Sequence, residues 1–202
     1  VVFAVVAAFS DLVTMVGGLY LPSEDVAVLG ISIRLAALAG FVTQATQQLV
    51  LPDLAEVLVR KADAEVRRLL LRVNLVSLGA ILICVAAAVV AGPLILRLFG
   101  GDYARGHWPL VLFMVSQTFR AASGLNQHLL SIGGHQGKTA SACVFAVALL
   151  FALSSILAPS WGLTGIAIAV VVADAAWAVL LAFQAQRHAG HRGDIAGLIF
   201  AR

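Results

Sequence analysis

Six apolar stretches fill almost all of this 202-residue chain, and each is long enough to cross a lipid bilayer. They cover residues 1–20, 26–50, 73–96, 108–131, 139–158 and 163–184. A bilayer core about 30 Å thick requires about 20 apolar residues in a helix. Because few residues lie outside these stretches, the sequence predicts an all-α integral membrane protein. We expect a bundle of six transmembrane helices over residues 1–184 and a cytoplasmic tail over 185–202.

The composition excludes a water-soluble fold. The chain is 61% hydrophobic and 11% charged, whereas soluble domains carry roughly 25% charged residues. Its net charge of +3 would also suit a nucleic-acid-binding protein. The basic residues lie at the ends of the apolar stretches, however, where membrane proteins place them. We therefore expect membrane lipids as partners and no nucleic acid.

The connections between the stretches differ in charge. Residues 51–72, 132–138 and the tail carry nine Lys and Arg residues, and the connections on the other side carry two, Arg97 and Arg105. Cytoplasmic loops are enriched in basic residues. The sequence therefore predicts that the N- and C-termini both lie in the cytoplasm.

The longest connection, residues 53–72, predicts a helix lying in the cytoplasmic interface. Glu56 with Arg60, and Asp63 with Arg67, are spaced four residues apart and can pair on its wet face. Its role is that of a linker helix or of a binder of anionic lipids. The apolar residues that can face lipid are Leu54, Val57, Leu58, Val66, Leu69 and Leu70.

Four ionisable residues fall near the middle of the predicted spans: Asp11, Arg34, Arg120 and Asp174. A charge there costs at least about 2.5–3.5 kcal/mol, so such residues face protein or a watery cavity. One interpretation is a substrate or ion pathway. The other is a pair of structural clamps, Asp11 with Arg34 and Asp174 with Arg120.

A polar stripe along residues 108–131 favours the pathway. Its members recur at intervals of three and four residues and are Ser116, Gln117, Arg120, Ser123, Gly124, Gln127 and Ser131. Such a stripe lines an aqueous cavity or holds helices together. The second span carries Gln44 and Gln48 in a weaker version of the stripe, and Gln47 is expected to meet a neighbouring helix instead.

Arginine suits phosphate because its planar fork donates two parallel hydrogen bonds. Arg34 and Arg120 are therefore candidates to hold a diphosphate, with Gln117 and Gln127 as further substrate-binding residues. Asp11 and Asp174 are candidates to bind a coupling ion. Four of the five histidines lie outside the spans, so we expect no metal site, and no cofactor or catalytic residue is assigned.

Four segments resemble motifs of bacterial polysaccharide-biosynthesis flippases. Residues 98–103 (LFGGDY) with 108–112 (WPLVL) resemble the element "LFG..Y..A...L..L". Residues 124–135 are similar to "G....LL..G", and residues 51–55 (LPDLA) to "P.LA". Residues 159–169 (PSWGLTGIAIA) resemble "P..G..GAAIA", with Ile166 where the family often has Ala.

The resemblance extends over about residues 11–192 and implies the C-terminal half of a lipid-linked oligosaccharide (O-antigen type) flippase of the bacterial inner membrane. These proteins belong to the multidrug/oligosaccharidyl-lipid/polysaccharide (MOP) exporter superfamily, whose fold is two six-helix lobes around a cavity that opens to either side in turn. The chain begins Val1-Val2-Phe3 without Met, and we expect an N-terminal lobe of the same protein as a partner. The motifs carry over no site residue.

The expected function is the flipping of a lipid-diphosphate-linked oligosaccharide for cell-surface polysaccharide or lipopolysaccharide biosynthesis by alternating access. An alternative is an ion-coupled multidrug exporter of the same superfamily, although the spans hold few of the aromatic residues that a drug pocket needs. A membrane-embedded glycan-processing enzyme is a further alternative. Because the outer connections are only about 5, 11 and 4 residues long, they leave no room for a sugar-processing site. We therefore expect that the protein is not an enzyme.

Overall fold

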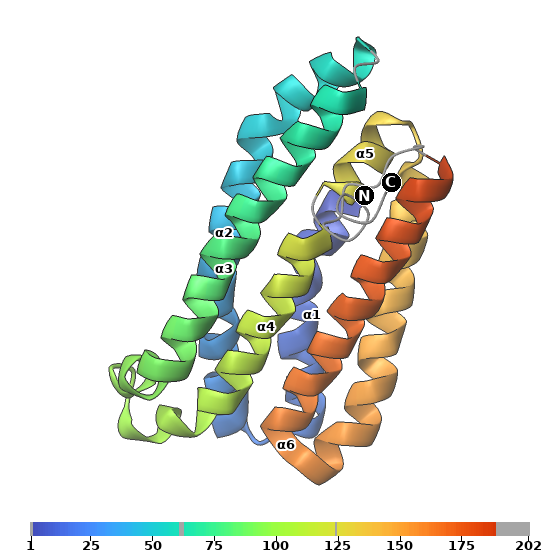
Figure 1. Ribbon diagram of the computed structural model, residues 1–202. Coiled ribbons are helices and arrows are strands. Elements are labelled where there is room, and N and C mark those ends of the chain that lie inside the picture. The colour runs from blue at the N-terminus through green and yellow to red at the C-terminus, as the bar shows by residue number, and fades with distance from the viewer. Residues whose placement is uncertain (1, 61–62, 124, 189–202) are drawn as a thin grey trace.

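The computed structural model describes residues 2–60, 63–123 and 125–188, and every element in these ranges is a helix (Figure 1). The all-α prediction is therefore confirmed. In chain order the elements are α1 (Val2–Tyr20), α2 (Ser23–Val59), α3 (Asp63–Arg97), the short 3-10 helix η1 (Gly101–Gly106), α4 (His107–Ser123), α5 (Asn126–Ile132) and α6 (Gln136–His188).

Helix α6 is a hairpin of two antiparallel arms. A straight helix of its 53 residues would be about 80 Å long. Yet the ring of His135, directly before the helix, stacks on that of His188, its last residue, with centroids 5.2 Å apart. The chain reverses at Gly162, whose φ of 54° and ψ of −132° suit a residue without a Cβ. The two arms, pale orange and red in Figure 1, contain the predicted stretches 139–158 and 163–184.

The fourth predicted span is not one helix. Helix α4 ends at Ser123 and α5 begins at Asn126, so the expected continuous stretch 108–131 is wrong. Leu125, between them, has φ −89° and ψ 14°, which departs from α-helical geometry. Its side chain is fully buried in one cluster with residues of α2 and α3.

The predicted interfacial helix over 53–72 is also wrong. Helix α2 continues to Val59 and α3 begins at Asp63, so this segment forms the end of an α2–α3 hairpin that extends beyond the rest of the bundle (Figure 1). Leu54, Val66 and Leu70, expected to face lipid, are almost fully buried. They pack with α5 in one apolar cluster. Helical periodicity alone does not distinguish a lipid-facing stripe from one that faces another helix.

The other residues of the segment 53–72 fulfil some of the expected contacts and not others. Val57 and Leu69 pack against the same cluster, and the predicted Glu56–Arg60 ion pair forms. The side chains of Leu58 and Asp63 lie outside the described part.

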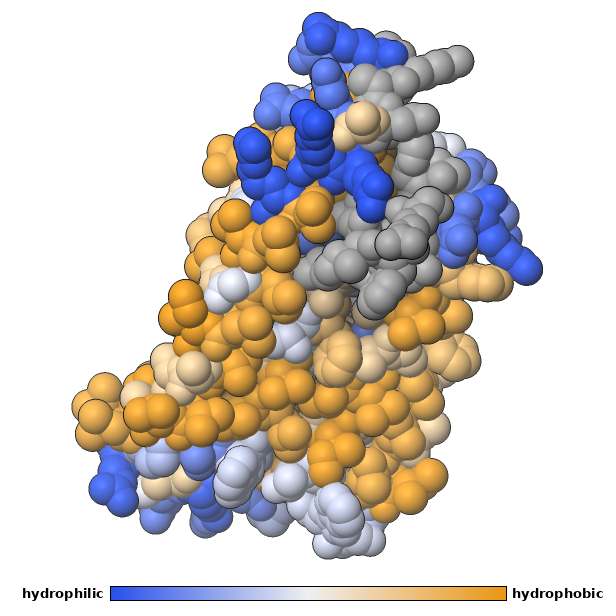
Figure 2. Space-filling view, in the orientation of Figure 1, coloured by the Kyte–Doolittle hydropathy of each residue, from blue (hydrophilic) through white to orange (hydrophobic). Residues whose placement is uncertain are grey.

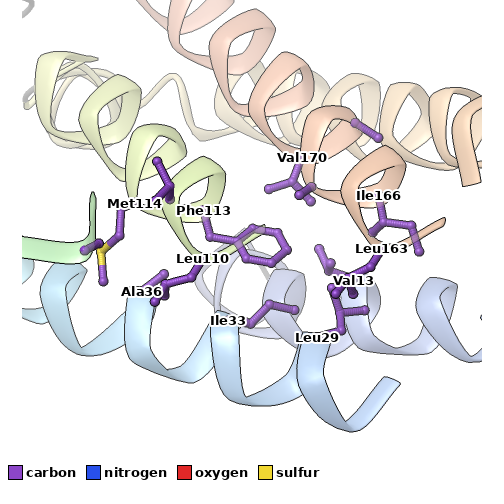
Figure 3. Close-up of a cluster of buried hydrophobic side chains, with 14 of the residues drawn as sticks. Val13, Leu29, Ile33, Ala36, Leu110, Phe113, Met114, Leu163, Ile166 and Val170 are labelled. Carbon is purple, nitrogen blue, oxygen red and sulfur yellow. The ribbon is translucent and has the colours of Figure 1, made fainter. Parts of the chain in front are cut away.

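The main core lies between α1, α2, α4 and α6, where Val13, Leu29, Ile33, Phe113 and Ile166 meet (Figure 3). Outside it, large apolar side chains cover the middle of the visible face, and polar residues gather at both ends (Figure 2). Helices α2, α3 and α6 each contain a segment long and apolar enough to cross a membrane. This pattern is compatible with a membrane protein.

Candidate functional site

The centre of the site is an ion pair between α4 and the second arm of α6. Nε and Nη2 of Arg120 both donate to Oδ1 of Asp174, at 3.1 and 3.0 Å. The Asp174 side chain is 2% exposed and that of Arg120 is 22% exposed. Of the two clamps considered for the mid-span charges, the structure therefore forms this one.

Two aromatic rings hold the guanidinium group from other sides of the bundle. Its Cζ lies 5.0 Å from the ring centroid of Phe9 on α1 and 5.2 Å from that of Trp177, one helical turn after Asp174 on α6. A cation is attracted by the face of an aromatic ring, and more strongly where water is excluded. Arg120 is thus positioned by three side chains from α1 and α6, and the carboxylate is only one of its partners.

Beside the pair lies a cavity of about 340 Å³. Most of its polar lining residues carry amide or hydroxyl groups rather than charges, and Arg120 is the one Lys or Arg among its lining residues in the described chain. Three of the four predicted substrate-binding residues, Arg120, Gln117 and Gln127, lie in its wall. The lining residues are Ser10, Ala37, Gly40, Thr43, Gln44, Gln47, Gln48, Gln117, Arg120, Ser123, Gln127, His128, Trp177 and Leu181.

The cavity runs along α2 toward the α2–α3 hairpin. Its lining on this helix extends from Ala37 to Gln48, a rise of about 16 Å at 1.5 Å per residue. Gln44 and Gln48 in this part of the wall are exposed. The cavity therefore extends from the ion pair along α2 in the direction of the α2–α3 hairpin.

A second, smaller void of about 30 Å³ lies on the inner side of Arg120. Ser10, Ser116, Gln117 and Asp174 contribute its polar lining together with the arginine. This volume suits one water molecule, and the polar groups around it supply the partners a buried water needs. Arg120 lines both spaces, whereas Asp174 lines only the inner one.

The amide of Gln117 is seated against the backbone of α2. A Cβ added to Gly40 would lie 2.6 Å from Oε1 of Gln117, which is shorter than a van der Waals contact. The absence of a side chain at Gly40 therefore allows the amide to occupy its place in the cavity wall.

Arg34 and Asp11 lie outside both spaces. Their side chains are exposed on α2 and α1, and they form no ion pair with each other or with any other described residue. The clamp between Asp11 and Arg34 is thus not formed. Arg34 and Arg120 do not share one cavity, although Arg34 is three residues from the lining residue Ala37 and neighbours it on the surface of α2.

Sequence reasoning missed several cavity residues. Gln47 was expected to meet a neighbouring helix, but it lines the cavity. Thr43 and Trp177 also line it, and the Thr43 hydroxyl and the Trp177 indole N–H are buried without a hydrogen-bond partner in the described chain. Helical spacing offered a signal, because Trp177 follows Asp174 by three residues and Thr43 follows Gly40 by three.

In the described ranges, no group of three or more His, Cys, Asp or Glu side chains is arranged to hold a metal ion. Comparison of the chain with protein-family models, curated proteins and solved structures finds no match. The chemistry of the cavity is therefore the basis for assigning a function.

Proposed function

We propose that this protein moves a lipid-diphosphate-linked oligosaccharide across the membrane by alternating access, for cell-surface polysaccharide biosynthesis. One observation carries the proposal: Arg120, partly exposed in the middle of the bundle, lies in the wall of a cavity otherwise lined by amides and hydroxyls. A guanidinium group recognises phosphate oxygens. Amide and hydroxyl groups both donate to and accept from hydroxyls, as sugar recognition requires.

The distribution of basic residues supports loading from the cytoplasm. Arg60, Lys138 and Arg187 are exposed at the end of the molecule that carries the α2–α3 hairpin, toward which the cavity extends along α2. The positive-inside rule assigns this end to the cytoplasm. We infer an inner-membrane protein with its cavity open to the cytoplasmic side, where a head group would enter while its lipid tail stays in the bilayer.

The exposed Arg34 and Asp11 support a second lobe. They lie about 17 and 14 Å from the ends of α2 and α1 that meet at residues 21–22, at 1.5 Å per residue, so their depths are similar. A charge facing hydrocarbon at such a depth costs about 2.5–3.5 kcal/mol. We infer that this face is covered by protein, and the proposed occupant is the N-terminal six-helix lobe of a two-lobed MOP-type transporter. In this arrangement the present chain supplies the other six spans.

An ion-coupled multidrug exporter is the competing proposal, and the cavity does not favour it. Trp177 is the one Phe, Tyr or Trp among its described lining residues, whereas five of them are glutamines. Apolar drugs bind in pockets that are predominantly hydrophobic and aromatic. Polar amides would remain without partners around such a ligand.

The test is a double variant that removes both charges but leaves a polar side chain at each of the two positions. Arg120→Gln with Asp174→Asn replaces the ion pair by neutral amides. We expect it to fold but to lose translocation of a polyprenyl-diphosphate-linked oligosaccharide, measured in proteoliposomes by accessibility of the sugar to an external glycosidase. The control is Arg97→Gln, which changes an exposed arginine outside the cavity lining. Wild-type translocation by the double variant would refute the arginine role, and drug export by the wild-type protein would favour the competing proposal.

Labelling tests the orientation separately. Gln136 and Ser160 are exposed at opposite ends of the first arm of α6. In a background with Cys84 and Cys143 changed to Ser, a membrane-impermeant maleimide should label a Ser160→Cys variant in intact cells. It should label a Gln136→Cys variant only after the membrane is opened, and the reverse pattern would overturn the orientation.

A further inference from the structure

We propose that the carboxylate of Asp174 is a built-in counter-anion for Arg120. It pairs with the guanidinium group before substrate binds, and it then competes with the diphosphate of the substrate for that group. This inference rests on the proposed function, because it concerns how occupancy of that same site is regulated. Asp174 is a positioning residue in this account, since it acts on the substrate through the arginine.

The geometry of the pair leaves the arginine able to change partners. A guanidinium group has five N–H donors, and Asp174 uses two of them, both on one oxygen. Asp174 does not line the cavity, whereas Arg120 does. An anion that arrives through the cavity therefore meets the arginine first and finds donors that the carboxylate does not occupy.

The single positive charge of Arg120 cannot neutralise both the Asp174 carboxylate and a bound diphosphate. Arg120 is the one Lys or Arg among the described lining residues, and like charges repel strongly in a poorly hydrated interior. Binding of a diphosphate therefore weakens the contact between Arg120 and Asp174. The inner void offers the released carboxylate the hydroxyl of Ser10 and the amide of Gln117 as alternative donors, whereas the Ser116 hydroxyl already donates to the carbonyl of Phe113.

The competition also explains how substrate leaves. An arginine without a competing anion would hold a diphosphate tightly in this cavity and release it slowly. Because the rings of Phe9 and Trp177 keep the guanidinium group in place, Asp174 can recapture it without a large movement. The carboxylate thus lowers the affinity for the diphosphate and raises the rate of its release.

Trp177 provides a direct readout of binding, because its ring centroid lies 5.2 Å from Cζ of Arg120. The chain has three tryptophans, so changing Trp108 and Trp161 to Phe leaves Trp177 as the single one in this chain. The full-length protein, with any further tryptophans outside this chain also changed to Phe, is placed in lipid nanodiscs and titrated with inorganic pyrophosphate while Trp177 fluorescence is recorded.

Asp174→Asn should bind pyrophosphate about 10- to 100-fold more tightly, as expected if the competitor leaves Arg120 available for about 1–10% of the time. In the translocation assay the same variant should show a lower KM together with a lower kcat. A purely structural role predicts weaker binding and no such split. Asp102→Asn is the matched control, since it makes the same chemical change at an exposed site on η1 outside the cavity, and it should leave affinity unchanged.

Unchanged or weaker pyrophosphate binding by Asp174→Asn, beside a clear response of the wild type, would overturn the counter-anion role and leave the proposed function standing. Absence of any response in the wild type, with normal translocation by the uncharged double variant, would overturn both. If Asp174→Asn does not fold, infrared difference spectra of the wild type labelled with ¹³C-aspartate decide the matter. Pyrophosphate should shift an aspartate carboxylate band, and an unchanged aspartate spectrum while Trp177 responds would refute the exchange.

Discussion

The energetic coupling between Arg120 and Asp174 can be measured by a double-mutant cycle. The cycle consists of Arg120→Met, Asp174→Leu and the variant with both changes. Each single change leaves one buried or partly buried charge without its partner, and this typically costs about 3–5 kcal/mol. The double variant replaces both charges with apolar groups of similar size and should recover most of that loss.

The size of the coupling follows from the geometry. Two unit charges about 4 Å apart interact by about 4 kcal/mol at an effective dielectric constant of about 20. The hydrogen bonds of 3.0 and 3.1 Å place the groups in this range. Because 22% of the arginine side chain is exposed, water in the cavity weakens the attraction. We therefore expect a coupling free energy of about 2–3 kcal/mol.

The assay is reversible unfolding in mixed micelles with a rising fraction of denaturing detergent, followed by circular dichroism. The chain supplies its own control cycle, Arg34→Met with Asp11→Leu, since these two charges are exposed and do not pair. That cycle should give a coupling near zero. A coupling for Arg120 and Asp174 no larger than the control value would show that the pair does not contribute as its geometry implies.

Three further predictions follow from packing. Gly40→Ala should displace the Gln117 amide and reduce translocation, and it should change stability by less than about 1 kcal/mol because only the end of a flexible side chain has to move. Gly30→Ala, where an added Cβ meets nothing within 4 Å, should leave translocation unchanged. Gly162→Ala should lower the unfolding free energy by about 1–3 kcal/mol, because the φ of Gly162 is 54°. Gly101 has neither a positive φ nor a close neighbour, so Gly101→Ala should leave the unfolding free energy nearly unchanged. Leu70→Ala should lower the unfolding free energy by about 2–5 kcal/mol, since Leu70 is buried between α2, α3 and α5. Leu49→Ala, at an exposed site on α2, should change the unfolding midpoint little. Equal effects of the two changes would contradict the hairpin packing.

Helices that depend on local composition were predictable. Apolar stretches of about 20 residues specify helices because their backbone groups must be satisfied internally, and α1 and the arms of α6 follow the predicted ranges closely. The interruption at Leu125 was not predictable in this way. At this point the Leu125 side chain is buried against α2 and α3, which are distant in the sequence.

The sequence by itself determined that this chain is built from apolar helices that carry a few ionisable residues, and that Gln117 and Arg120 share one face of a helix. Those properties depend on residue type and on the helical repeat. Only the tertiary structure decided that Arg120 meets Asp174 beside a cavity, that Arg34 lies outside it, and that Thr43 and Trp177 complete its wall. The physical reason is that the rotation of each helix about its axis is set by packing against its neighbours, and that packing joins residues 54 positions apart.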